Sequence, residues 1–415
     1  MDMVETGHAL SPRQTCDETS IDTLKMKYNF DEIIDRTNTN AVKLERCKTL
    51  FGTEDVLPLW VADMDFRTPD FVLEAIQKRI EHPILGYTMP PRNFFNLFTE
   101  WVRTHHDWEL ERDEVGFVPG IVPALAFAVQ CYTEPGDEII VQPPVYYPFF
   151  NVIKNNNRTL VYNQLIEEKG KFEMDFEDLE RKITSKTKML ILCNPHNPGG
   201  RVWSLKTLRK LDNICSKHNV LIVSDEIHAD MVLSGSKHIP FATVSKKAAA
   251  NSVTFMAPSK VFNMPGVVSS FYIIPNPELY RKYAEYLEAS EMGSGNIFAY
   301  QATVACYAKG ENWRVAMLKY VEENVNYVME YLREFIPQIK PMRPEASFLM
   351  WLDCRDLGMD SDELHRFFAR KAGLGLNKGT IFGPGGEYHL RMNVACSRKI
   401  IEQAMMQLKK AISFK

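Results

Sequence analysis

Residues 188–228 read KMLILCNPHNPGGRVWSLKTLRKLDNICSKHNVLIVSDEIH. The runs at 188–193 and 220–224 are short and apolar and are followed by polar or turn-forming residues, which is typical of buried strands. Between them, residues 204–218 carry apolar side chains at helical spacing. A strand, a helix and a second strand in this order predict a βαβ unit with parallel strands.

The same alternation extends outward from this unit. Further strands are predicted at 138–142, 252–256 and 271–274, and further helices at 123–132 and 175–182. We therefore expect an α/β fold with a largely parallel sheet. The last hundred residues differ: they predict helices at 313–335 and 361–372 and strands at 347–353 and 388–394, as in a smaller α+β domain.

These patterns predict three parts of the chain. Residues 1–27 are polar, lack a helical stripe and are interpreted as a loose N-terminal arm. Residues 28–70 and 305–415 are expected to form the small α+β domain together, and residues 71–304 the large domain.

The composition excludes several classes of protein. Of 415 residues, 45% are hydrophobic, which suffices for a sizeable core, and 49 Lys and Arg against 53 Asp and Glu give a net charge of −4. Without a basic excess we expect no nucleic-acid or anionic-membrane partner. The chain shows neither a run of about 18 apolar residues nor an apolar N-terminal segment typical of secretion. Its eight scattered cysteines form no CxxC pair, so we expect reduced thiols, a cytoplasmic location and no metal site.

Polar residues follow four of the expected strands. In open α/β sheets, ligands bind beyond the carboxyl ends of the strands. Tyr146, Asn194, Asp225 and Lys260 should therefore converge on one crevice.

Two of these residues suggest the kind of chemistry. A partly desolvated amine at Lys260 would have a lowered pKa and could form a Schiff base, although a lysine after a strand can also simply extend to solvent. Asp225 could be an ordinary helix N-cap, or a fixed anion that keeps a pyridine nitrogen protonated so that the ring accepts electrons.

The remaining candidates also have two explanations each. Asn194 could form a turn or donate a hydrogen bond to a phenolic ring oxygen. Tyr146 and Tyr147 could pack in the core or offer a ring face to a cofactor. Gly120 precedes a helix whose first amides suit a phosphate, and Arg391 could be a surface residue or a clamp on a substrate carboxylate.

In combination, these features are what a pyridoxal phosphate enzyme needs, and the sequence from about residue 28 onward resembles a known family. It is similar to the fold-type I pyridoxal phosphate enzymes of the class I/II aminotransferase superfamily, and within them to the MalY/PatB-type cystathionine β-lyases and cystalysin-like C–S lyases. The motifs that carry the resemblance are Tyr28-Asn29-Phe30-Asp31, Trp60-Val61-Ala62-Asp63-Met64-Asp65-Phe66, Asn194-Pro195-His196-Asn197-Pro198, Asp225-Glu226-Ile227-His228-Ala229-Asp230 and Ala257-Pro258-Ser259-Lys260.

The resemblance implies a mostly parallel seven-stranded sheet between helices, and pyridoxal 5'-phosphate as cofactor. Lys260 would carry the cofactor covalently, and Asp225 would pair with its ring nitrogen. Asn194 would bond the ring hydroxyl and Tyr146 would stack on the ring.

The resemblance also implies how the phosphate is held. The backbone amides of Ile121 and Val122 and the side chain of Ser259 would bind it. Tyr87 would reach the phosphate of a neighbouring subunit, so that a homodimer with a shared active site is implied.

A small amino-acid substrate is implied on the other side of the cofactor. Arg391 would hold its α-carboxylate, and Tyr147, Val61 and Ala62 would border it.

Two positions depart from the usual aminotransferase pattern. The cofactor-contacting tyrosine expected three residues after the aspartate is His228, and the phosphate-binding arginine expected eight residues after the lysine is Val268. Both departures resemble the lyase branch.

The resemblance therefore predicts a C–S β-lyase that cleaves cystathionine or related cysteine S-conjugates to pyruvate, ammonia and a thiol, with a place in methionine biosynthesis. The alternative is a class I/II aminotransferase. A third possibility, binding of a regulatory protein without catalysis, has no sequence feature in its favour.

Overall fold

The computed structural model describes residues 28–414, so the expected N-terminal arm lies outside the described residues. The largest sheet has seven strands, as the resemblance implied. In spatial order these are β2 (Val115–Val118), β10 (Ser270–Ile273), β9 (Ser252–Met256), β8 (Leu221–Asp225), β7 (Thr187–Cys193), β3 (Glu138–Val141) and β4 (Thr159–Tyr162). Only β10 runs opposite to the others, which confirms the α/β class and the largely parallel sheet.

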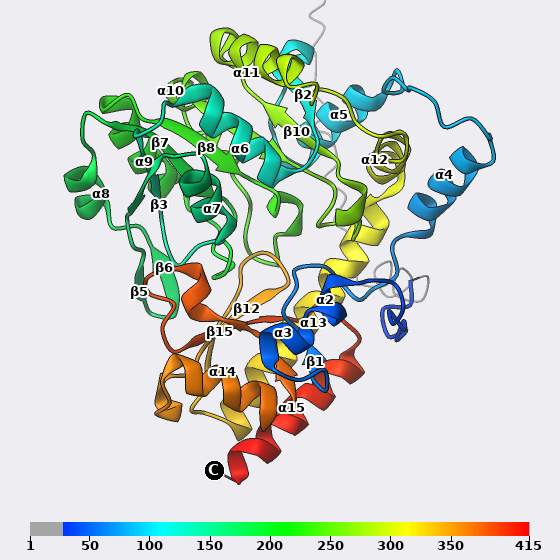
Figure 1. The fold of residues 1–415 in the computed structure, drawn as a ribbon, viewed down its shortest axis with the longest axis vertical. Coiled ribbons are helices and arrows are strands. Elements are labelled where there is room, and N and C mark those ends of the chain that lie inside the picture. Colours follow the sequence, from blue (N-terminus) through cyan, green and yellow to red (C-terminus); the bar gives the residue numbers. More distant parts are fainter. Residues whose placement is uncertain (1–27, 415) are drawn as a thin grey trace, which may run out of the picture.

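Helices cover both faces of this sheet (Figure 1). Alternate side chains of the buried strands point to opposite faces. One face packs against α6 (Ile121–Tyr132), α7 (Pro148–Asn155) and α11 (Pro277–Ala289). The other packs against α8 (Phe176–Lys182), α9 (Leu205–Lys217) and α10 (Lys246–Ala250).

Local signals explain where these helices begin. The Ser204 hydroxyl accepts a hydrogen bond from the Thr207 amide at the start of α9, and the Asp175 carboxylate accepts one from the Asp178 amide at the start of α8. The expected helices and strands of the large sheet are confirmed, with boundaries displaced by at most two residues.

A second, antiparallel sheet lies in the C-terminal part of the chain. Its order is β11 (Lys340–Met342), β12 (Leu349–Asp353), β15 (His389–Asn393) and β14 (Asn377–Lys378). The helices α13 (Glu311–Phe335), α14 (Ser361–Arg370) and α15 (Arg398–Ser413) accompany it. A third core connects them with α4 (Asp70–Ile80), α5 (Phe94–His106) and α12 (Ile297–Lys309).

The N-terminal segment packs beside this C-terminal sheet, with α2 (Val42–Glu45) and α3 (Cys47–Phe51) lying close to the C-terminal helices in Figure 1. Strand β1 (Leu57–Pro58) pairs in parallel with β13 (Leu374–Gly375). A short hairpin of β5 (Ile166–Glu168) and β6 (Lys171–Glu173) completes the strands. The pairing agrees with a small domain built from both ends of the chain, whose boundaries stay a prediction.

The described cysteines are all buried and none is in a disulfide, while Cys16 lies outside the described residues. Within residues 28–414, no helix combines the length and the apolar character that crossing a membrane requires.

Candidate active site

A cavity of about 230 Å³ lies at the carboxyl ends of the central strands. The predicted site residues that line it are Ala62, Ile121, Val122, Tyr146, Asp225, His228, Ser259 and Lys260. They come from the loops after β3, β8 and β9, from the first turn of α6 and from the segment that follows β1. The structure thus brings most of the predicted residues to one place.

Lys260 follows β9 after a short turn. Burial and the nearby Arg391 guanidinium lower the pKa of its amine to about 8, while Asp63 and Asp225 oppose this shift. The amine donates a hydrogen bond to the Ala62 carbonyl oxygen. An amine with such a pKa is partly neutral at physiological pH, and only a neutral amine is nucleophilic.

Asp225 ends β8 and is 3% exposed. One carboxylate oxygen accepts a hydrogen bond of 3.1 Å from the Ile227 amide. Burial raises the pKa of the carboxyl to about 7 despite the Lys260 amine. A positively charged ring nitrogen placed against Asp225 would offset this burial and keep the carboxylate ionised.

Tyr146 follows the Pro143-Pro144 pair and is enclosed by its neighbours. Its ring lies 5.8 Å from Phe149, edge to face, and 5.7 Å from Tyr147. Burial raises the pKa of its phenol well above the usual range, so the hydroxyl keeps its proton. Tyr147 itself is 37% exposed and lies outside the set of lining residues.

The phosphate site expected at the start of α6 has the required backbone. Gly120 precedes the helix with φ of 93°, in the region that favours glycine. Ile121 and Val122 form the first turn, whose amides have no partner within the helix. Ser259, Ser269 and Ser270 line the same cavity. Amides of a helix N-terminus and hydroxyl groups are suitable donors to a phosphate.

Arg391 lies in β15 and is 3% exposed. Its guanidinium donates to Asn197 Oδ1 at 3.0 Å, to Asn377 Oδ1 at 2.6 Å and to the Trp60 carbonyl at 2.9 Å. Its Nε has no hydrogen-bond partner among the described residues. Burial lowers the pKa of this guanidinium to about 10, so it remains a cation at neutral pH.

His228 is buried in the wall of the cavity. Burial, together with the Lys260 and Arg391 charges, lowers its pKa to about 3. The imidazole is therefore neutral, and its buried Nδ1 has no partner among the described residues. A polar group that enters the cavity would satisfy this nitrogen.

Asn194 keeps its expected contact with the ring hydroxyl only as a prediction. It does not belong to the lining residues, and its amide nitrogen donates to the Ile239 carbonyl at 3.0 Å and to Glu226 Oε1 at 3.3 Å. Because these acceptors lie behind the loop, the amide nitrogen would have to leave them to reach a ring oxygen in the cavity. Asn197 lines the cavity instead.

Sequence reasoning missed Asn197, although it stands in the same Asn-Pro-His-Asn-Pro motif. Its hydrogen bond with Arg391 links the cavity to β15. Ser269 and Ser270 were also missed, because nothing in the sequence distinguishes them from other hydroxyl residues at the start of a strand. The available sequence signal was proximity: Asn197 is three residues from Asn194, and Ser269 and Ser270 directly follow Val268.

Besides Tyr147 and Asn194, three predicted residues are not among those that line this cavity: Arg391, Tyr87 and Val61. Tyr87 lies in the loop after α4 and is fully exposed. Val61 borders the cavity only through its neighbour Ala62, and its carbonyl accepts a hydrogen bond of 2.6 Å from Asn393.

The donor set fits pyridoxal phosphate. The enclosed Lys260 amine can bind the aldehyde of the cofactor, the buried Asp225 carboxyl can pair with its ring nitrogen, and the amides of the helix can bind its phosphate. The unpartnered His228 Nδ1 and the neighbouring Asn197 leave polar groups for the ring.

The comparisons agree with this site. Residues 54–408 match the family described as aminotransferase class I and II, so the chain belongs to that family.

Similar proteins narrow the comparison. The chain is 42% identical to cystathionine β-lyase PatB of Bacillus subtilis over 93% of this chain and all of that protein. Among solved structures, cystalysin from Treponema denticola, which contains pyridoxal 5'-phosphate, is 33% identical with a TM-score of 0.90 over 93% of this chain and 99% of the other. The pyridoxal phosphate-bound C–S lyase from Staphylococcus hominis is 36% identical with a TM-score of 0.85 over 92% and 98%.

Proposed function

We propose that this chain is a pyridoxal phosphate-dependent C–S β-lyase that cleaves L-cystathionine or a related cysteine S-conjugate. The observation that carries the proposal is that the Lys260 amine and the Asp225 carboxyl line one cavity at the end of the parallel strands. The names and folds of the C–S lyases described above support the lyase over the aminotransferase alternative.

Five of the residues that line the cavity bind the cofactor in this proposal. Lys260 holds the cofactor, Asp225 faces its ring nitrogen, and the amides of Ile121 and Val122 with Ser259 hold the phosphate. When bound, the cofactor supplies an electron sink for negative charge at the substrate Cα.

Arg391 is proposed to orient the substrate. Its charge suits the α-carboxylate, and its hydrogen bonds to Asn197 and Asn377 fix the plane of the guanidinium before a substrate arrives. Tyr147, Val61 and Ala62 border the substrate.

Once the substrate's amino group has displaced it from the cofactor, the free Lys260 amine is proposed to take the proton from the substrate Cα, since its lowered pKa leaves a neutral fraction at physiological pH. The Cβ–S bond then breaks, and the sulfur leaves as a thiolate that takes up a proton. Tyr146 keeps its phenol proton and, with Lys260, is one of two donors for that step. Loss of the Cα proton and the thiolate leaves a three-carbon enamine, and its hydrolysis after release gives pyruvate and ammonia.

Product analysis tests the proposal. The purified protein with cystathionine and no added 2-oxo acid should give pyruvate, ammonia and thiol in equal amounts. Strict dependence on a 2-oxo acid, with no pyruvate in its absence, would instead establish the aminotransferase.

The Lys260→Ala variant checks the cofactor. It should lose both the yellow absorption and the borohydride-trapped adduct on the peptide that contains residue 260. An adduct that persists in this variant would assign the cofactor to a different lysine.

We also propose a homodimer in the cytoplasm. Ile84, Leu85, Tyr87 and Met89 form an exposed, mostly apolar loop after α4, and covering it with a second copy would remove this surface from water. Tyr87 would then reach the phosphate in the partner's cavity.

A further inference from the structure

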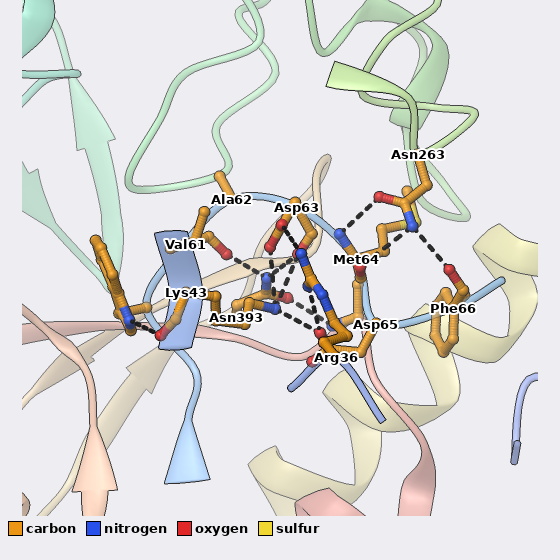
Figure 2. Close-up of polar contacts among 12 residues, drawn as sticks. Arg36, Lys43, Val61, Ala62, Asp63, Met64, Asp65, Phe66, Asn263 and Asn393 are labelled. Carbon is orange, nitrogen blue, oxygen red and sulfur yellow. Dashed lines mark hydrogen bonds and ion pairs between the residues drawn. The ribbon is translucent and has the colours of Figure 1, made fainter. Parts of the chain in front are cut away.

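The segment Trp60–Phe66, here named the strap, passes between the two sheets with its backbone held by side chains (Figure 2). Asn393 donates to the carbonyl oxygens of Val61 at 2.6 Å and Asp63 at 2.7 Å. Asn263 donates to those of Met64 at 3.1 Å and Phe66 at 2.7 Å. The strap is therefore fixed on one side to β15 and on the other to the turn that follows Lys260.

A group of four charges adds a further constraint on the strap. Lys43 Nζ lies 3.1 Å from Asp63 Oδ1 and 2.9 Å from Asp65 Oδ1. Arg36 pairs with the same two carboxylates at 2.7 and 2.9 Å. Lys43 is only 2% exposed, and burying its ammonium costs more than an apolar side chain would. Fixing the strap does not by itself require this charge.

The strap connects these charges to the reactive amine. Ala62 lies directly before Asp63, and its carbonyl oxygen accepts the hydrogen bond from Lys260 Nζ. The charged and titratable groups that act on Lys260 come from several elements: Arg391 on β15, Asp225 on β8, His228 after β8, Asp63 on the strap and Lys43 on α2.

Asp63 and Asp65 differ in their electrostatic effect on the Lys260 amine. Both pair with Arg36 and Lys43, but Asp63 acts on the Lys260 amine and Asp65 is not among its main influences. Burial opposes ionisation of Asp63, yet Lys43 and Arg36 hold the pKa of its carboxyl below the usual value, so it carries a negative charge toward the amine.

We propose that Asp63 is a positioning residue for Lys260: anchored by Lys43 and Arg36, it holds the Ala62 carbonyl and its own negative charge where they stabilise the protonated form of the Lys260 amine. This inference rests on the proposed function, in which Lys260 takes up the substrate proton. A charged donor strengthens the hydrogen bond to Ala62, so the strap favours the state that follows proton uptake.

The test compares two isosteric variants, Asp63→Asn and Asp65→Asn, in the full-length chain freed of cofactor. The pH dependence of reductive methylation at Lys260, read by mass spectrometry of its peptide, gives the titration midpoint of the amine. Asp63→Asn should lower this midpoint by about one unit, a tenfold change in proton affinity, because an opposing charge is lost. Asp65→Asn, the matched control, should move it by less than half as much.

Lys43→Met is a second variant, for which the titration midpoint of Lys260 should shift in the opposite direction. It removes a cation near Lys260 and keeps the buried stem, while Arg36 still anchors Asp63, so the midpoint should rise. A strap that had merely loosened would not give shifts of opposite direction. With cofactor restored, Asp63→Asn should lower kcat several-fold and change KM by less than twofold, since Arg391 and its partners are intact.

Equal shifts in the Asp63 and Asp65 variants, or no shift in Asp63→Asn, would overturn the inference. If Lys43→Met fails to fold in thermal melting, the two asparagine variants still decide. The methylation measurement needs no turnover, so an absence of pyruvate formation would count against the proposed function alone.

Discussion

Asn194 and Asn197 stand three residues apart in one loop and have opposite surroundings. The amide nitrogen of Asn194 is bonded to Ile239 and Glu226 behind the loop, whereas Asn197 faces the cavity and accepts from Arg391. The sequence alone does not indicate which of the two asparagines faces the cavity, because the direction of each side chain depends on where its hydrogen-bond partners lie in the folded chain.

This difference predicts distinct phenotypes. Asn197→Ala removes a charge-assisted hydrogen bond to the buried Arg391, worth about 1.5–3 kcal/mol, and should raise KM for cystathionine roughly tenfold as well as lower the free energy of unfolding. Asn194→Ala should leave KM unchanged and reduce the free energy of unfolding by about 1–3 kcal/mol, because Glu226 and Ile239 lose a buried donor. Steady-state kinetics distinguish the two, with urea unfolding measuring stability in both; the reverse pattern in KM would support the ring contact of Asn194.

The raised pKa of Asp225 predicts that the free energy of unfolding of the cofactor-free chain depends on pH. Its pKa in the folded chain, about 7, lies above the ordinary value of 3.8. Below about pH 4 the carboxyl is protonated in both states; between these values only the unfolded state ionises, so stability falls as the pH rises toward 7.

Asp225→Asn stays neutral and avoids this loss. At pH 8 the free energy of unfolding of the variant, measured by urea titration, should exceed that of the unmodified chain by on the order of a few kcal/mol, and at pH 4 by much less. Its activity should be lost, in keeping with an active-site group that is retained at the expense of stability. A stability difference that is the same at both pH values would contradict the assignment of the raised pKa to Asp225.

At the scale of elements, apolar runs made most of the large sheet predictable. Strands β3, β7, β8, β9 and β10 are buried on both faces and read as continuous apolar segments between polar turns. Short strands are harder to predict from the sequence. Strands β1 and β13 have two residues each and pair although they lie far apart in the sequence, which no local pattern indicates. The cavity residues at the ends of the central strands could be predicted because the apolar runs show where those strands end.

The start of α6 gives a prediction about an element. Gly120 and Gly136 both have positive φ, 93° and 92°, and an added Cβ would meet nothing closer than 3.5 Å at Gly120 and nothing within 4 Å at Gly136. Replacement by alanine should therefore cost similar strain at both, about 1–2 kcal/mol of stability.

Only Gly120→Ala should also weaken retention of the cofactor, because it alone turns the chain into the helix whose amides line the cavity. Equilibrium dialysis against pyridoxal phosphate measures this. Equal affinity in the two variants would remove the α6 turn from the phosphate site.

At the scale of the whole molecule, the exposed loop with Tyr87 is the feature that a single chain leaves unexplained. If Tyr87 completes the partner's site, Tyr87→Ala and Lys260→Ala chains should complement each other. In a hybrid dimer, one site would receive the intact Lys260 of one subunit and the intact Tyr87 of the other.

Mixing the two inactive variants after mild unfolding and refolding should recover roughly a quarter of normal activity, since half of the randomly assembled dimers are hybrids with one working site. Each variant refolded alone serves as the control. No recovery in the mixture would place Tyr87 in the cavity of its own chain or in none.

The hydrogen bond between Asn393 and the Val61 carbonyl joins residues 332 positions apart. During translation the strap is therefore made long before Arg391 and Asn393. A nascent polypeptide that ends before Arg391 thus has every strand of the large sheet but lacks an organised substrate-binding wall, and catalytic competence requires that both late residues have been made.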